Sequence, residues 1–187
     1  MNRPRATPAL RRLRALLMVL GAASGAQAEG PAARKVIDFG DAAVSLAWRS
    51  SWQLETAAPK GMPATVEFHA PDRLQMLALL TPLQGSPGLA SDEAMKGVVG
   101  KSSAQFQEQA VEKDIKLQRI SKGDAHGYFV CVTDKAPKPD EYKFLCQGVV
   151  ALKDLPISFT LLYNDGGKPD GEAVLSALKT IQVADQI

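Results

Sequence analysis

Short segments in which apolar and polar residues alternate recur along most of this chain. In Thr65–His69 the apolar side chains are Val66 and Phe68, and in Ile157–Tyr163 every second side chain is a large apolar one. This alternation is typical of a strand with one buried face. About eight such segments predict strands near residues 36–39, 44–48, 65–69, 74–80, 115–120, 128–133, 142–152 and 157–163.

Two other segments have helical spacing. The first extends from Ser91 to Glu112, with Ser91 as its N-cap and Asp92 and Glu93 in its first turn. Its apolar stripe consists of Met95, Val99, Phe106 and Ala110, and the stripe near the C-terminus consists of Val174, Ala177, Leu178 and Ile181. The sequence therefore predicts an α+β fold, an antiparallel sheet of about six to eight strands covered by two main helices.

One strand pairing can be predicted in detail. If the segments around residues 128–133 and 144–149 form a hairpin with Cys131 opposite Cys146, then Phe129 falls opposite Gly148. An aromatic ring can cover the bare glycine backbone in that position. Apolar side chains lie on both faces of this hairpin, so we expect it to lie centrally in the sheet and to be covered on both sides.

Five arginines and a short apolar run begin the chain. The arginines occur within residues 3–14, the apolar run covers residues 15–23, and Ala26-Gln27-Ala28 follows. This pattern is typical of a secretory signal peptide. A membrane anchor is the alternative, but the run is about half of the ~20 residues that a spanning helix needs. We expect cleavage after Ala28 and a single periplasmic or secreted domain, residues 29–187, without a stable membrane anchor.

The charge of this expected domain differs in sign from that of the whole chain. The chain has 22 basic and 20 acidic residues, and five of the basic residues lie in the leader. Removing them leaves 17 basic against 20 acidic residues, a formal charge of −3. A mildly acidic domain without a basic run attracts nucleic acid or anionic lipid weakly. We therefore expect neither as a partner.

The order of elements resembles that of the PsbP and DcrB group of small exported domains. The resemblance rests on early strands leading into Trp48 and Trp52, the Ser91-Asp92-Glu93 helix start, Gly127-Tyr128-Phe129, and a closing helix with Ser176-Ala177-Leu178. It covers nearly all of residues 29–187. It implies an α/β/α sandwich and an accessory or binding role, and it carries over no functional residue.

Cys131 and Cys146 are the only two cysteines. An even pair in an exported protein favours a disulfide. Two free buried thiols are one alternative, and a redox or metal site is another. A redox pair is usually separated by two residues and zinc needs about four ligands, so the chemical alternatives fit poorly. A structural disulfide closing this loop would contribute about 3 kcal/mol.

No catalytic, cofactor or metal motif stands out in the sequence. His69 falls on the polar face of its strand and His126 precedes Gly127 at a predicted turn, so both are expected at the surface. Glu67, Asp72 and Asp124 could act as acid and base only if the fold brought them together. We therefore predict no metal, no cofactor and no catalytic residue.

Trp48, Arg49 and Trp52 are the best candidates for contact with a partner. Aromatic and arginine side chains are enriched at binding hot spots. The alternative is that the two tryptophans seal the edge of the core. Either way, the leading interpretation is an exported, non-catalytic accessory or binding protein for an unknown protein or small ligand of the cell envelope. A carboxylate-dependent hydrolase and a structural partner in an envelope complex are the alternatives.

Overall fold

The alternating segments form most of a seven-stranded antiparallel sheet, with the strand order β3-β4-β5-β9-β8-β7-β6. Its strands are β3 (Gln53–Ala57), β4 (Thr65–His69), β5 (Met76–Pro82), β6 (Gln118–Lys122), β7 (Ala125–Thr133), β8 (Phe144–Leu152) and β9 (Leu155–Tyr163). This computed structural model describes residues 33–40, 42–57 and 64–184. The predicted signal peptide lies outside the described residues. The α+β class predicted from the sequence is confirmed.

A second, three-stranded antiparallel sheet has the order β1-β2-β10. Its strands are β1 (Ala33–Asp38), β2 (Ala43–Trp48) and β10 (Gln182–Val183). The expectation of one sheet is therefore wrong for the two earliest strands: β2 pairs with β1 on one side and with β10, the last described strand, on the other. Two strands, β3 and β10, were not predicted, because β3 has one large apolar residue and β10 has only two residues.

In the described parts of the chain, two α-helices accompany the sheets, α1 (Asp92–Ala104) and α2 (Lys168–Lys179), each preceded by a short 3-10 helix (Pro87–Ala90 and Asp165–Gly167). The predicted N-cap is confirmed, since the Ser91 hydroxyl accepts a hydrogen bond from the Ala94 N–H. The first helix ends eight residues before the predicted Glu112, and Ala110 instead forms a β-bridge with Asp134. Neither α-helix of the described residues is long and apolar enough to cross a membrane.

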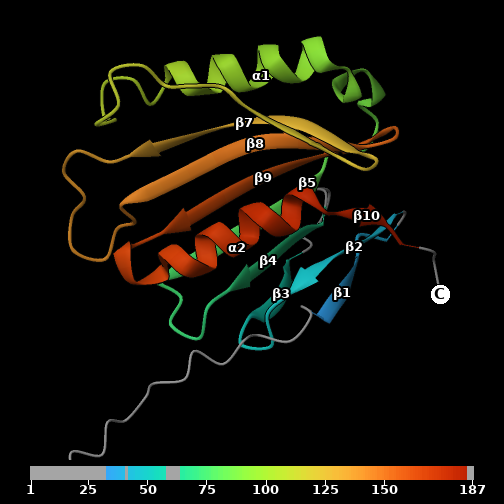
Figure 1. Cartoon of the computed structure of the whole chain (residues 1–187), viewed down its shortest axis with the longest axis horizontal. Coiled ribbons are helices and arrows are strands. Elements are labelled where there is room, and N and C mark those ends of the chain that lie inside the picture. Colours follow the sequence, from blue (N-terminus) through green and yellow to red (C-terminus); the bar gives the residue numbers. More distant parts are fainter. Residues whose placement is uncertain (1–32, 41, 58–63, 185–187) are drawn as a thin grey trace, which may run out of the picture. The chain divides into compact units, whose positions relative to one another are not determined.

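The two helices lie on opposite faces of the large sheet (Figure 1). Under α1, a small core joins Met95 and Val99 to side chains of β7 and β8. On the other face, α2 packs with the small sheet and the large sheet around a larger core. This core contains, among others, Leu46, Trp52, Phe68, Phe129, Phe159 and Leu178. The order of layers, with a helix on each side of the large sheet, agrees with the predicted α/β/α sandwich.

The predicted β7–β8 register is confirmed. Cys131 pairs with Cys146, Phe129 with Gly148 and Thr133 with Phe144. The hairpin is covered on both faces, as expected, but it does not lie at the centre of the sheet. The central strand is β9, and only the edge strand β6 lies outside β7.

Candidate functional site

Three metal-ligand side chains project from β3 and β4 on one face of the large sheet. Glu55 lies directly opposite Glu67 in the antiparallel pairing, and His69 follows Glu67 by two residues. Val66 and Phe68 alternate with them and enter the larger core. Because successive side chains of a strand point to opposite faces, Glu67 and His69 lie on the face that carries α1.

His69 is buried although it belongs to the polar side of its strand. It is 6% exposed, so the prediction of a solvated surface histidine is wrong for this residue. Its Nδ1 lies 2.6 Å from the Ala70 carbonyl oxygen. A carbonyl only accepts hydrogen bonds, so Nδ1 carries the hydrogen and the neutral ring has its lone pair on Nε2.

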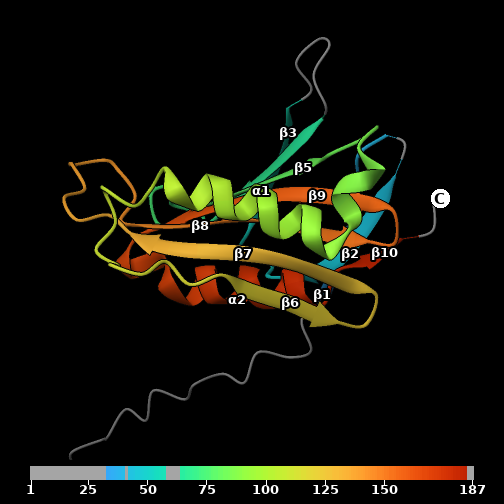
Figure 2. The same ribbon diagram turned by 90° about the horizontal axis from the view of Figure 1, so that it is seen from above.

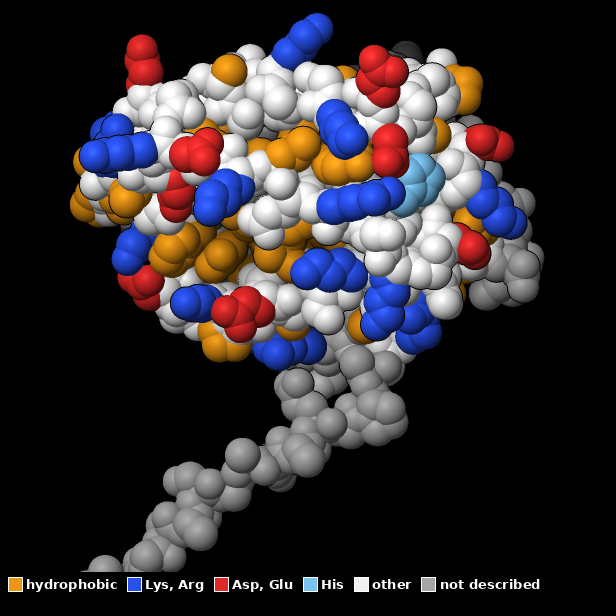
Figure 3. All heavy atoms as spheres, turned by 45° about the horizontal axis from the view of Figure 1, so that its top comes forward, with side chains coloured by type: hydrophobic (Ala, Val, Ile, Leu, Met, Phe, Trp, Pro, Cys, Tyr) orange, Lys and Arg blue, Asp and Glu red, His pale blue; other side chains and the backbone are white. Residues whose placement is uncertain are grey.

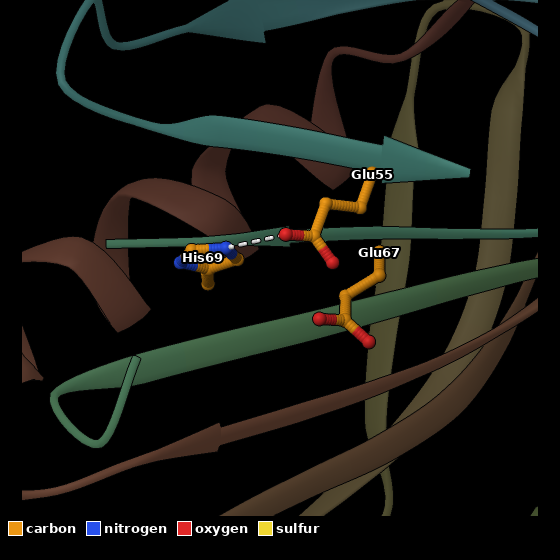
Figure 4. Close-up of side chains that lie close together, drawn as sticks. All are labelled: Glu55, Glu67 and His69. Carbon is orange, nitrogen blue, oxygen red and sulfur yellow. Dashed lines mark ion pairs between the residues drawn. The ribbon is translucent and has the colours of Figure 1, made fainter. Parts of the chain in front are cut away.

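That lone pair points toward carboxylates. His69 Nε2 lies 3.6 Å from Glu55 Oε1, and both glutamate carboxylates lie on the same side of the imidazole ring (Figure 4). The nitrogen is shielded from solvent and has no hydrogen-bond partner among the described residues. One ligand atom from each of Glu55, Glu67 and His69 can be chosen so that all three lie within 4.8 Å of one another.

Arg73, from the turn between β4 and β5, brings a positive charge to these carboxylates. Its Nη1 forms an ion pair with Glu67 Oε1 and lies 3.7 Å from Glu55 Oε2. The Tyr142 hydroxyl donates to the Arg73 carbonyl oxygen over 2.9 Å. Burial raises the pKa of Tyr142; Arg73 opposes this shift, and Glu67 and Asp72 add to it. The phenol therefore stays protonated and able to donate at neutral pH.

An apolar hollow of about 230 Å³ lies on the same face, next to the end of the α1 segment. It is lined by Phe106, Gln109, Ala110, Val132, Thr133, Asp134, Glu141, Tyr142, Lys143, Leu145 and Leu162. Its floor continues toward the acidic cluster, because Leu145, Leu162, Leu77 and His69 are register neighbours across β8, β9, β5 and β4. The hollow and the cluster therefore belong to one face.

This face is only partly covered by a helix. The helix α1 packs against β7 and β8, and its Ser102 hydroxyl donates to Gln147 of β8 over 2.6 Å. Seen from above, β3 and β5 extend beyond the helix (Figure 2). Leu79, Thr160 and Leu162 are accordingly only partly buried. The uncovered part of this face is the place where a ligand or partner can reach the sheet.

The predicted disulfide forms in the structure. Cys131 and Cys146 are bonded, with Cα atoms 4.1 Å apart. Cys146 is fully buried and Cys131 is partly buried against the larger core. The pair joins the two strands at the position predicted from the register, away from the acidic cluster.

The aromatic candidates take part in the core. Trp52 is 5% exposed, and Trp48 packs edge-on against it with ring centroids 5.4 Å apart. Both rings contact Phe68. Asp170 Oδ1 of α2 accepts from Trp52 Nε1 over 2.8 Å and from Arg49 Nη1 over 2.9 Å. Through these contacts, the turn between β2 and β3 packs against α2.

Of the three carboxylates considered for acid–base chemistry, Asp124 lies far from the other two. Glu67 pairs with Arg73, whereas the Asp72 carboxylate accepts from the Leu74 N–H within its own turn. Asp124 lies in the β6–β7 turn, at the far side of the sheet from β4. Four strand spacings separate β4 from β7, which is about 20 Å. His126 is half-buried, with Nε2 2.9 Å from the Ala90 carbonyl oxygen.

Two members of the cluster, Glu55 and Arg73, were not identified from the sequence. The sequence does show that Glu67 and His69, two residues apart on one strand, share a face, and this spacing is its one indication of the cluster. Glu55 could be added only with the β3–β4 register. Arg73 and Tyr142 lie in different turns, 69 positions apart, and the fold brings them together.

Comparisons with known proteins identify no relative from which a function follows. No family model matches the chain, and no curated protein matches it. A solved structure from Bacteroides thetaiotaomicron aligns at a TM-score of 0.46 and 10% identity. The alignment covers 76% of this chain and 46% of that one, so the chain spans less than half of its length.

Proposed function

We propose that the protein is an exported, non-catalytic accessory or binding protein of the PsbP- and DcrB-like kind. In this proposal it binds a partner protein of the cell envelope through the apolar hollow beside α1. The hollow is the observation that carries the proposal. The expected leader and the disulfide between Cys131 and Cys146 are in keeping with an oxidising compartment.

The size of the hollow favours a protein side chain over a small-molecule ligand. Its volume of about 230 Å³ is below the roughly 300–1,000 Å³ of typical small-ligand pockets. Phe106, Val132 and Leu145 supply apolar lining, while Asp134 and Lys143 contribute polar groups. An apolar centre with a polar rim is the usual pattern of a protein–protein contact. One large apolar side chain of a partner fits this space.

The charge distribution does not favour a polyanionic partner. On the face drawn in Figure 3, Lys and Arg side chains are interspersed with Asp and Glu side chains, and apolar groups lie between them. A nucleic-acid surface normally presents a field of positive charge. A protein partner with an apolar anchor agrees better with this mixed surface.

Co-purification tests the proposal. The tagged protein, isolated from its native envelope, should retain a discrete partner, and the purified partner should bind it directly. Phe106→Ser removes the aromatic wall of the hollow and should weaken binding by about 2 kcal/mol or more, the scale of a hot spot. Val98→Ser makes the same kind of change on the exposed side of α1 and should bind as the unchanged protein does.

A hydrolase would give a different result. It would turn over a substrate without a stable partner, and Glu67→Gln would abolish that turnover. Such an outcome would contradict the proposal, and so would equal partner binding by the Phe106→Ser and Val98→Ser variants. Export is tested separately, since N-terminal sequencing of the mature protein should begin at Glu29. An intact Met1 in the membrane fraction would contradict export with cleavage.

A further inference from the structure

We propose that Glu55, Glu67 and His69 form a binding site for one divalent transition-metal ion of the zinc type. The inference does not depend on partner binding at the hollow. It rests on the tautomer and burial of His69 and on the two carboxylates that face it. The three side chains come from neighbouring strands and are drawn in Figure 4.

The histidine is oriented as a metal ligand. Its Nδ1–H donates to the Ala70 carbonyl oxygen over 2.6 Å, which fixes the ring and leaves the lone pair on Nε2. Metal-binding histidines usually donate their second ring N–H to a carbonyl or carboxylate in this way. The His69 side chain is only 7% exposed, and its Nε2 is buried without a hydrogen-bond partner in the described parts of the chain. A cation would satisfy this nitrogen.

The two glutamates supply negative charge at the same place. Glu55 and Glu67 are directly opposite each other on antiparallel strands, an arrangement in which like charges destabilise the pairing. A bound cation removes this repulsion. The ligand atoms lie within 4.8 Å of one another, while zinc bonds of about 2.0–2.2 Å require them to be closer. Glu55, with a side chain 61% exposed, can make this adjustment by rotation.

Arg73 is the cation that competes for these carboxylates. Its side chain is 48% exposed and reaches the cluster from the β4–β5 turn. It pairs with Glu67 Oε1 and with Glu55 Oε2. The guanidinium offsets part of the negative charge that would attract a metal ion, and it repels an approaching cation. This competition predicts that removing the Arg73 charge strengthens metal binding.

The donor set selects the class of ion. One imidazole nitrogen and two carboxylate oxygens suit zinc and similar transition metals, and three protein ligands leave a position for water. Calcium takes six to eight oxygen ligands, more than the cluster offers, and does not favour an imidazole. We therefore expect Zn²⁺ to bind and Ca²⁺ not to compete with it.

Calorimetric titration of the chelator-treated protein with ZnCl₂ tests the inference. The protein should bind one Zn²⁺, and Glu55→Gln should weaken binding by about tenfold or more, on the scale seen for damaged metal sites. His69→Gln should weaken it similarly, but His69 is buried, so circular dichroism must show that this variant folds. Arg73→Gln should bind Zn²⁺ several times more tightly. Glu172→Gln and His126→Gln, which lie outside the cluster, should bind as the unchanged protein does.

The opposite results would overturn the inference. The inference is wrong if the folded protein takes up no Zn²⁺, or if Glu55→Gln binds Zn²⁺ with unchanged affinity. It is also wrong if Arg73→Gln binds Zn²⁺ more weakly or if His126→Gln loses Zn²⁺ binding. Partner binding at the hollow is measured separately with Phe106→Ser. A failure of the metal site therefore leaves the proposed function standing, and the reverse also holds.

Discussion

Cys131 lies directly opposite Cys146 across the β7–β8 pairing, with Cα atoms 4.1 Å apart. The disulfide between them links two strands that are connected by a long loop. A separation this short is typical of a non-hydrogen-bonded antiparallel pair, for which about 4.5 Å is usual. The loop between the two strands spans residues 134–143 and cannot set the register as a two-residue turn does. The covalent bond therefore helps to hold the register.

Reduction of this disulfide should lower stability without unfolding the protein. The expected loss is about 3 kcal/mol for a loop of this length. Chemical denaturation with and without a reductant should show a lower midpoint in the reduced sample, and circular dichroism should show retained strand content. Two alkylatable thiols in unreduced protein from the envelope would contradict the assignment.

Gly148→Ala should destabilise the sheet. A Cβ at position 148 would lie 2.8 Å from Phe129 Cα and would also collide with the Tyr128 carbonyl oxygen. Overpacking of this kind usually costs about 1–3 kcal/mol. Thermal or denaturant unfolding measures the change.

Gly100→Ala is the matched control. A Cβ at this position of α1 meets no atom within 4 Å. Replacing a helical glycine by alanine should raise stability by roughly 0.5–1 kcal/mol. The same chemical change should thus have opposite signs at the two positions. Equal effects would contradict the close approach of β7 and β8.

The Glu112 carboxylate should make stability depend on pH in the acid range. Burial alone raises its pKa, but hydrogen bonds from the Thr133 N–H and hydroxyl, each 2.8 Å, outweigh burial and bring the pKa below its usual 4.5. A lowered pKa in the folded state stabilises the protein above about pH 4.5. This contribution is lost as the pH falls through the lowered value.

Glu112→Gln should therefore be less stable than the unchanged protein at pH 7. The difference in denaturation midpoint should shrink as the pH is lowered below 4.5. Glu108→Gln, an exposed acid in the same segment, is the control and should show a smaller difference at pH 7. A Glu112→Gln difference that stays constant from pH 7 to pH 3, about the range over which glutamates titrate, would contradict the role of the carboxylate.

Asp170→Ala should destabilise the packing of α2 against the turn between β2 and β3. The substitution leaves the buried Trp52 Nε1–H without its acceptor and removes the ion pair of Arg49. An unsatisfied buried donor costs about 1–3 kcal/mol. Tryptophan fluorescence and denaturation should both change. Asp165→Ala, whose carboxylate is 71% exposed and pairs with Lys143, should cost about 0–1 kcal/mol.

The sequence predicted the parts of the fold that local patterns determine. The β7–β8 register followed from two cysteines and a glycine opposite an aromatic residue. The start of α1 followed from Ser91 and the acids after it. Its end did not, because the apolar stripe continues through Phe106 and Ala110 after the helix has ended.

The candidate site was largely beyond prediction from the sequence. The alternation of polar and apolar residues predicted that His69 shares a strand face with Glu67. Because the neighbours on that face are polar, the imidazole was expected to be exposed to solvent, whereas the structure buries it. Glu55 belongs to an edge strand with one large apolar residue, so its pairing with Glu67 required the structure. Contacts between Arg73 and Tyr142 depend on two turns far apart in the sequence.

Site-specific photocrosslinking in the native envelope tests the central claim, that the hollow beside α1 binds a partner protein. A photoreactive residue at Gln109, which is exposed and lines the hollow, should give one discrete crosslinked adduct. The same residue at Glu172, exposed on α2 on the opposite face of the sheet, should give none. No adduct at Gln109, or the same adduct at both positions, would contradict the claim.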